Sequence, residues 1–237
     1  TPEDTARRAQ MGLEMGFRGL KMKCDLGDPI AERVAAVREV APDFSIVLDP
    51  NERFVDLDGA RAVARSLERF DRVIFESPVP QDRLDWYVEL RSQIPQSIAL
   101  HLTSINDLLP ALRLEAADHY NLLGPLKQFV DWATLTRTAG CATWRGTGMD
   151  LGVRDMSSVH AAAAAGCELP SDIIGHLLRE DDLVAEPIAF ADGSLIVPDA
   201  PGLGVELDRV ALERYRVSLA ENELAVDGGR RAATVGI

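Results

Sequence analysis

Short apolar segments that each end in charged or polar residues recur along the first third of this chain, with one predicted helix between neighbours. The closing residues are, in chain order, Lys21 and Lys23, then Asp49 and Asn51, then Glu76. Short apolar segments that alternate with helices are typical of buried parallel strands. In a β/α barrel the loops that follow the strands converge on one mouth, where the chemistry takes place. The pattern therefore predicts a barrel whose mouth holds two lysines opposite two acids.

The same alternation continues along the chain and predicts an α/β fold of the TIM-type (β/α) barrel class. We expect seven strands, at residues 18–23, 45–49, 73–76, 97–101, 119–123, 141–145 and 183–188. Helices are expected to begin at Thr1, Asp28, Asp58, Asp82 and Ser104, and again near residues 130 and 154. A closed barrel has eight strands, so we expect the first strand to lie upstream, in a longer protein. The barrel domain is expected over residues 1–215, and a C-terminal tail over 216–237.

The composition limits the classes of function and the compartment. Hydrophobic residues make up 46% of the chain, which supports a substantial core, and the formal net charge of −13 argues against a nucleic-acid-binding surface. The three cysteines are widely spaced and form no CxxC motif, as expected in a reducing cytosol. No basic and apolar leader opens the chain, and no apolar run approaches the roughly 20 residues of a membrane span. We expect a cytoplasmic protein that binds neither nucleic acid nor membrane.

Five segments in this order resemble the enolase superfamily, in particular its mandelate racemase and muconate lactonizing enzyme group. They read GFRGLKMK, IVLDPNERF, IFESPVP, GVRDMSSVHAAAAAG and DGSLIVPDAPGLGVEL. The resemblance implies a (β/α)7β-like barrel whose mouth is closed by an N-terminal capping domain that selects the substrate. That domain is absent from this sequence, and the tail at 216–237 is expected to pack against it.

The resemblance also implies Mg²⁺-assisted removal of the proton next to a carboxylate, because a divalent cation stabilises the resulting enolate. Asp49 and Glu76 match the family's first two metal ligands, and Lys23 matches its base. Lys21 points the same way as Lys23 by strand alternation, and the two ammonium groups are expected to lower each other's pKa. Asn51 is expected to support the ligand or the substrate.

Three positions depart from the family pattern. The place of the third carboxylate holds His101 and Leu102; His101 is the third candidate metal ligand, although imidazole suits zinc, iron or nickel better than magnesium. The place of a second lysine holds Leu123. The strand 141–145 ends at Arg145, with no family histidine at its tip. The Arg145 guanidinium is expected either to bind a substrate carboxylate or to pair with a neighbouring acid.

The leading hypothesis is a divergent isomerase, cycloisomerase or dehydratase that removes the α-proton of a small carboxylate with Lys23 as the base. The alternative is a barrel that has lost metal-dependent catalysis and acts as a small-molecule-binding or regulatory protein. A third interpretation is a sugar-phosphate barrel with a Schiff base on Lys21 or Lys23, which leaves Asp49 and Glu76 without a role. The expected partners are a small carboxylate and further copies of the chain in a homo-oligomer.

Overall fold

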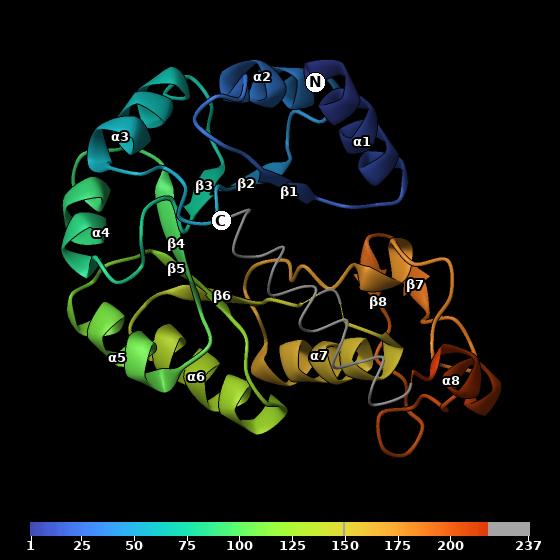
Figure 1. Ribbon diagram of the computed structural model, residues 1–237. Helices are drawn as coiled ribbons and strands as arrows, with labels where there is room; N and C mark the ends of the chain where they lie inside the picture. Colours follow the sequence, from blue (N-terminus) through green and yellow to red (C-terminus); the bar gives the residue numbers. More distant parts are fainter. Residues whose placement is uncertain (149, 218–237) are drawn as a thin grey trace.

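One curled parallel sheet forms the centre of the computed structural model, which describes residues 1–148 and 150–217. Its six strands follow one another in chain order, and each pairs with its neighbours in sequence (Figure 1). The strands are β1 (Gly19–Lys23), β2 (Ser45–Asp49), β3 (Val73–Glu76), β4 (Ser97–Leu102), β5 (His119–Leu122) and β6 (Ala142–Arg145). The predicted α/β barrel class is confirmed, in the form of a curled half-barrel.

Helices follow the strands and cover the convex side of the sheet. Those before and between the strands are α1 (Pro2–Glu14), α2 (Ile30–Val40), α3 (Leu57–Ser66), α4 (Leu84–Arg91), α5 (Ile105–Arg113) and α6 (Leu126–Thr138). After β6 come α7 (Gly152–Ala165), the 3-10 turn η1 (Gly175–Leu177), the hairpin of β7 (Phe190–Ala191) and β8 (Ser194–Leu195), and α8 (Arg209–Tyr215). Helices α2 to α6 ring the outside of the sheet, and α7 lies beyond β6 (Figure 1). None of the described helices has the length and apolarity needed to cross a membrane.

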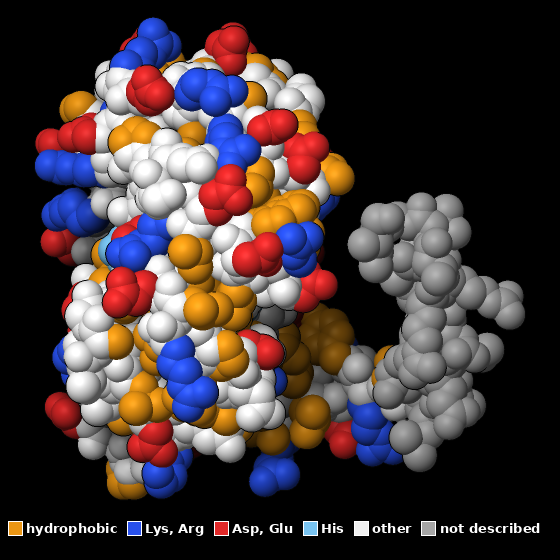
Figure 2. Space-filling view, turned by 90° about the vertical axis from the view of Figure 1, so that its left-hand side faces the viewer, with side chains coloured by type: hydrophobic (Ala, Val, Ile, Leu, Met, Phe, Trp, Pro, Cys, Tyr) orange, Lys and Arg blue, Asp and Glu red, His pale blue; other side chains and the backbone are white. Residues whose placement is uncertain are grey.

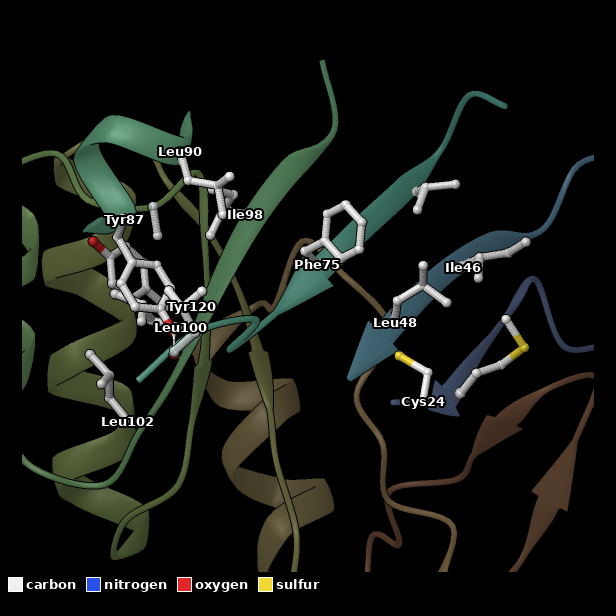
Figure 3. Close-up of a cluster of buried hydrophobic side chains, with 14 of the residues drawn as sticks. Cys24, Ile46, Leu48, Phe75, Tyr87, Leu90, Ile98, Leu100, Leu102 and Tyr120 are labelled. Carbon is white, nitrogen blue, oxygen red and sulfur yellow. Dashed lines mark hydrogen bonds between the residues drawn. The ribbon is translucent and has the colours of Figure 1, made fainter. Parts of the chain in front are cut away.

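Strand alternation divides the side chains between two faces. One set points outward to the helices and builds the main core; it includes Ile46, Leu48, Phe75, Ile98, Leu100 and Tyr120 (Figure 3). A smaller apolar cluster of Val47, Ile74, Ala99 and Trp144 fills the concave side. Because alternate residues of a strand face the same way, the positions two residues further along β2, β3 and β4 also face inward. These positions are Asp49, Glu76 and His101, so the fold itself places polar groups at one end of the concave face.

Side-chain caps confirm two of the predicted helix starts, and three others differ from the prediction. The Thr1 hydroxyl accepts from the Asp4 N–H at 3.2 Å, and the Ser104 hydroxyl accepts from the Asn106 N–H at 3.1 Å, as their sequence positions predict. The prediction that Asp58 caps α3 is wrong. Asp56 is the cap, because its extended backbone lets its carboxylate accept from the Gly59 N–H at 2.8 Å. Likewise α4 begins after Arg83 instead of at Asp82, and α2 begins after Pro29 instead of at Asp28; neither helix has a side-chain cap.

The strand predicted at residues 183–188 does not join the sheet. Val184 makes only an isolated bridge to Leu207. Ile188 packs with Met156 and Val159 of α7, so its apolar character reflects packing on a helix. The described sheet therefore ends at β1 and β6. From residue 218 onward the predicted tail lies outside the described residues, and the domain boundary at 215 stays a prediction.

The outer face covered by α3 to α5 carries acidic and basic side chains in a mixed pattern (Figure 2). Several of them pair, as Arg91 Nε does with Asp118 Oδ1 at 2.7 Å and Arg83 with Asp85 at 2.7 Å. Such exposed pairs contribute little to stability. A second group of charges, with buried acids, lies on the concave side of the sheet.

Candidate functional site

Lys21 lies at the centre of a cluster of carboxylates on the concave face. Its Nζ is 2.7 Å from Glu76 Oε1, 2.9 Å from Asp49 Oδ2 and 3.2 Å from Asp172 Oδ2. The Asp49 and Glu76 side chains are fully buried, whereas 21% of the Lys21 side chain is exposed. Strands β1, β2 and β3 thus bring the predicted lysine and two predicted acids together.

Lys23 lies nearer the rim, on the same side of β1. Its Nζ is 2.5 Å from Asp49 Oδ2 and 2.7 Å from Asn51 Oδ1, and 59% of its side chain is exposed. Asn51 has a φ of +49°, a left-handed conformation that asparagine tolerates better than most residues. In this turn its N–H donates to Asp49 Oδ1 at 3.0 Å. The Asp-Pro-Asn sequence therefore orients both the acid and the amide towards Lys23.

The charges of this cluster shift the pKa values of its members. Burial alone would lower the pKa of Lys21, but three nearby carboxylates, Glu76 foremost, outweigh it and raise that pKa. Burial would raise the pKa of Asp49, but the two lysines outweigh it and lower that pKa. For Glu76 burial outweighs the attraction of Lys21 and raises the pKa to about 7. The expectation of a lowered pKa is wrong for Lys21, because its nearest charges are carboxylates.

His101 also reaches this region, as predicted. Its Nδ1 lies 3.6 Å from Glu76 Oε1, and its N–H donates to Ser77 Oγ at 3.3 Å. Burial, and then the charge of Lys21, lower the pKa of its imidazole. His101 is therefore a neutral neighbour of Glu76 at neutral pH.

Two members of the cluster were not predicted. Asn121, fully buried on β5, donates from Nδ2 to Glu76 Oε1 at 2.9 Å. A signal for it exists, since Asn121 is the polar residue between the apolar Tyr120 and Leu122. Asp172 follows α7 in irregular chain, where no periodicity indicates which way a side chain points. Only the folded structure brings Asp172 to Lys21.

Arg145 is not part of the cluster. Its side chain lies between the sheet and the helices, where Nη1 donates to the Gly124 carbonyl at 2.7 Å and the guanidinium stacks 4.9 Å from the Phe129 ring centroid. The neighbouring Trp144 is the residue of β6 that faces the concave side. Alternation therefore turns Arg145 outward, and the structure does not place it to bind a substrate with Lys21.

The donor set does not fit Mg²⁺ in this arrangement. The ion demands hard oxygen ligands at about 2.1 Å in octahedral geometry. Across residues 1–148 and 150–217, no group of three or more His, Cys, Asp or Glu side chains is placed to hold a metal ion. The Lys21 ammonium lies between Asp49 and Glu76, and His101 adds an imidazole. Metal binding by Asp49, Glu76 and His101 stays a prediction.

A cavity of about 780 Å³ opens beside Lys21 and Asp172. Its walls come from α1, β1, α7 and the β7–β8 hairpin, and include the concave side chains Val47, Ile74 and Trp144. Of the cluster, only Lys21 and Asp172 line this cavity; Lys23, Asp49, Glu76 and His101 do not.

Comparison with known proteins identifies the family. The family described as "Enolase C-terminal domain-like" matches residues 4–211. The chain belongs to this family. Muconate cycloisomerase 1 of Rhodococcus opacus is 29% identical over 206 residues, which cover 82% of this chain and 55% of that protein. The N-succinylamino acid racemase of Thermus thermophilus is 29% identical over 222 residues, which cover 90% of this chain and 58% of that protein.

A solved structure agrees with this assignment to the enolase C-terminal domain-like family. The mandelate racemase/muconate lactonizing family protein from Azoarcus sp. EbN1 superimposes with a TM-score of 0.83 at 27% identity, over 92% of this chain and 63% of that one. The predicted superfamily is confirmed. The chain spans less than two thirds of the length of each of these proteins.

Proposed function

We propose that the protein carrying this chain catalyses proton transfer at the carbon next to the carboxylate of a small organic acid, as an isomerase, cycloisomerase or dehydratase. One observation carries this proposal. Lys21 and Lys23 face Asp49 and Glu76 at the ends of three consecutive parallel strands, within 3 Å of them. The isomerase names of the two curated relatives support the same class of reaction.

Lys21 would bind and polarise the substrate. Its ammonium is fixed by three carboxylates, 21% of its side chain is exposed, and Lys21 is one of the residues that line the cavity. Such a preoriented charge stabilises the negative charge that develops on a carboxylate oxygen when the neighbouring carbon loses a proton. Because the charge is already in place, little reorganisation is needed during the reaction.

Lys23 would carry the proton. It is the more exposed of the two lysines, and the reach of a general base is about 3 Å. Asp49 Oδ2 at 2.5 Å and Asn51 Oδ1 at 2.7 Å hold the amine of Lys23 in place. Held there, Lys23 would serve as the base without a second lysine.

The resemblance to the superfamily implies Mg²⁺ at this mouth, where a bound ion would supply Lewis-acid stabilisation of the enolate. Asp49 and Glu76 would be its carboxylate ligands. Their present contacts with Lys21 do not fit the ion, so the roles of Lys21 and Lys23 are derived without it.

The proposal is tested by exchange of the substrate α-proton in deuterated solvent, followed by NMR on a panel of small carboxylic acids. Lys23→Ala in the intact protein should lose exchange by about 10²–10⁴-fold. Lys127→Ala is the matched control, because Lys127 is 85% exposed on α6 and pairs with Asp131. Equal exchange in Lys23→Ala and the parent would place the base elsewhere.

A second candidate is a barrel that binds a small carboxylate without turning it over. Leu102 and Leu123 favour it, because they provide neither the third carboxylate nor the second lysine of the family pattern. Calorimetry with the same acids separates the two functions. Binding that depends on Lys21 without any α-proton exchange would support the binding protein and reject the enzyme.

A further inference from the structure

A second group of buried charges lies at the start of α7, outside the cluster around Lys21. Arg179 Nη2 is 2.7 Å from Asp155 Oδ2 and 2.6 Å from Asp182 Oδ2. The Asp155 side chain is fully buried, and 15% of the Arg179 side chain is exposed. Separating a buried ion pair leaves an uncompensated charge in the interior and is strongly unfavourable. Asp155 therefore holds the guanidinium in place.

The guanidinium joins the chain that follows the 3-10 turn η1 to the start of α7. Its Nη1 donates to the Asp150 carbonyl, in the loop between β6 and α7. Asp155 lies in the first turn of α7. The Asp182 carboxylate in turn accepts from the N–H of Gly152, the first residue of that helix, at 2.8 Å. Arg179 thus contacts both the loop that precedes α7 and the first turn of the helix.

Two glycines leave the space that these side chains occupy. A Cβ atom at Gly175 would lie 2.5 Å from Arg179 Nη1 and 3.2 Å from Asp155 Oδ2. A Cβ atom at Gly152 would lie 2.9 Å from Asp182 Oδ2. Neither glycine has a positive φ, so an alanine could adopt the same backbone conformation. The space beside the guanidinium, and not the backbone, therefore requires glycine at position 175.

The segment that ends at Arg179 forms one wall of the cavity of about 780 Å³. Residues 171–174 and 176–178 all line that cavity. The other end of the segment is fixed at Asp172, whose carbonyl accepts from Thr147 Oγ1 at 2.9 Å. Asp172 and Arg179 are therefore the two anchors of this wall.

We propose that Arg179 is a positioning residue: by holding the end of the segment 172–178 on α7, its guanidinium keeps the cavity wall in place and Asp172 at Lys21. The Asp172 carboxylate lies 3.2 Å from Lys21 Nζ. The three hydrogen-bond partners of Arg179 lie outside the cluster around Lys21, so its effect passes through Asp172 and the wall. The catalytic consequence rests on the proposed function, whereas the fixing of the wall does not.

Amide hydrogen exchange of the intact protein, followed by peptide mass spectrometry, tests the fixing of the wall without any substrate. The N–H groups of Leu177 and Leu178 are hydrogen-bonded within η1 at 3.0 Å and report on this segment. Arg179→Gln combined with Asp155→Asn removes both charges, so no unpaired charge is left at position 155. In this double variant the amides of residues 171–178 should exchange at least about 10-fold faster, whereas those of β2 to β4 should keep the wild-type rate.

A second variant reaches the same contact without removing a charge. Gly175→Ala displaces the guanidinium, because the added Cβ takes the place of Arg179 Nη1. It should speed exchange of the same amides, so the test does not depend on the folding of the double variant. Arg214→Gln is the matched control. Arg214 Nη1 pairs with Asp181 Oδ2 at 3.1 Å, but its side chain is 64% exposed, so its loss should leave the exchange unchanged.

Unchanged exchange of residues 171–178 in both Gly175→Ala and the double variant would overturn the proposal. An equal acceleration over the whole sheet would also overturn it, because Arg179 would then serve general stability. The same holds for an acceleration in Arg214→Gln as large as that in Gly175→Ala.

The catalytic consequence is separable from the proposed activity. In a protein that exchanges substrate α-protons, Gly175→Ala should raise KM about 10–100-fold and change kcat less, because Lys21 is the proposed binding group. Arg179→Lys keeps the charge without the planar fork and should raise KM less than Arg179→Gln. An unchanged KM beside faster amide exchange would overturn the positioning role and keep the enzyme. A wild-type protein without α-proton exchange would refute the enzyme, and amide exchange would still decide whether Arg179 fixes the wall.

Discussion

Asn121 Nδ2 donates to Glu76 Oε1 at 2.9 Å, the same carboxylate oxygen that Lys21 contacts. This hydrogen bond comes from β5, two strands away from the strand of Glu76, and both side chains are fully buried. It holds the buried acid from the side opposite β1. The arrangement of the cluster therefore depends on a neutral amide as well as on charges.

Asn121→Leu should destabilise the protein by about 1–3 kcal/mol, because it leaves a buried carboxylate oxygen with one partner fewer. The free energy of unfolding is measured by urea denaturation at pH 7. Asn106→Leu on the exposed side of α5 is the control, and it should change the free energy by no more than about 0.5 kcal/mol. Equal effects of the two variants would show that the Asn121 bond to Glu76 contributes nothing.

Lys21→Ala should cost roughly 3–5 kcal/mol of folding free energy at neutral pH, because it leaves two buried carboxylates without their common partner. Lys23→Ala should cost less than about 1 kcal/mol, since its side chain is 59% exposed. Urea denaturation of both variants provides the comparison. A larger loss of folding free energy in Lys23→Ala than in Lys21→Ala would contradict the central position of Lys21.

His119 should make stability depend on pH. Burial lowers the pKa of its imidazole, so between that lowered pKa and the ordinary value the unfolded chain binds more protons than the folded one. His119 should therefore contribute stability that rises from pH 5 to pH 7, by at most about 1.4 kcal/mol per pH unit, whereas the raised pKa of Glu76 contributes in the opposite direction over the same range. His119→Gln should reduce the slope, and combination with His176→Gln should reduce it further, because burial lowers the pKa of His176 as well. A slope that His119→Gln leaves unchanged would contradict the assignment.

Cys24 should resist alkylation in the folded protein. The side chain is buried, and burial raises the pKa of its thiol to about 12, so the reactive thiolate is scarce at pH 8. Cys141 and Cys167 are only partly buried and should react with iodoacetamide first. Peptide mass spectrometry reads out all three sites, and Cys24 should be modified only after denaturation. Modification of Cys24 at the rate of the unfolded chain would disprove this.

The sequence alone predicts a strand correctly where the local pattern of apolar residues agrees with the position of that strand in the folded sheet. Strands β2 and β3 have the predicted bounds, because each apolar run stops at an acid that cannot continue a buried strand. Since those acids end consecutive strands, their meeting with Lys21 follows from the parallel order alone. The predictable part of the site is the part built from strand ends.

The remaining errors come from orientation and from long-range packing. The position of Arg145 at a strand end predicts a side chain at the mouth, but the register of β6 turns Trp144 inward and Arg145 outward. The apolar residues at 183–188 predict a strand, yet Ile188 packs on α7. Asp172 has no local signal, since only the arrangement of the whole sheet brings it to Lys21.

The contact of Lys21 with Asp172 joins two parts of the chain that are 151 residues apart. The Asp172 N–H also donates to the Arg145 carbonyl at 3.2 Å, so the ion pair links the first strand of the sheet to the end of the last one. The ion pair therefore connects the two edges of the six-stranded half-barrel. Contacts between such distant residues carry a large loop-closure cost and are slow to form. The charge centre of the site would thus be assembled late in folding, when the sheet has reached its final curvature.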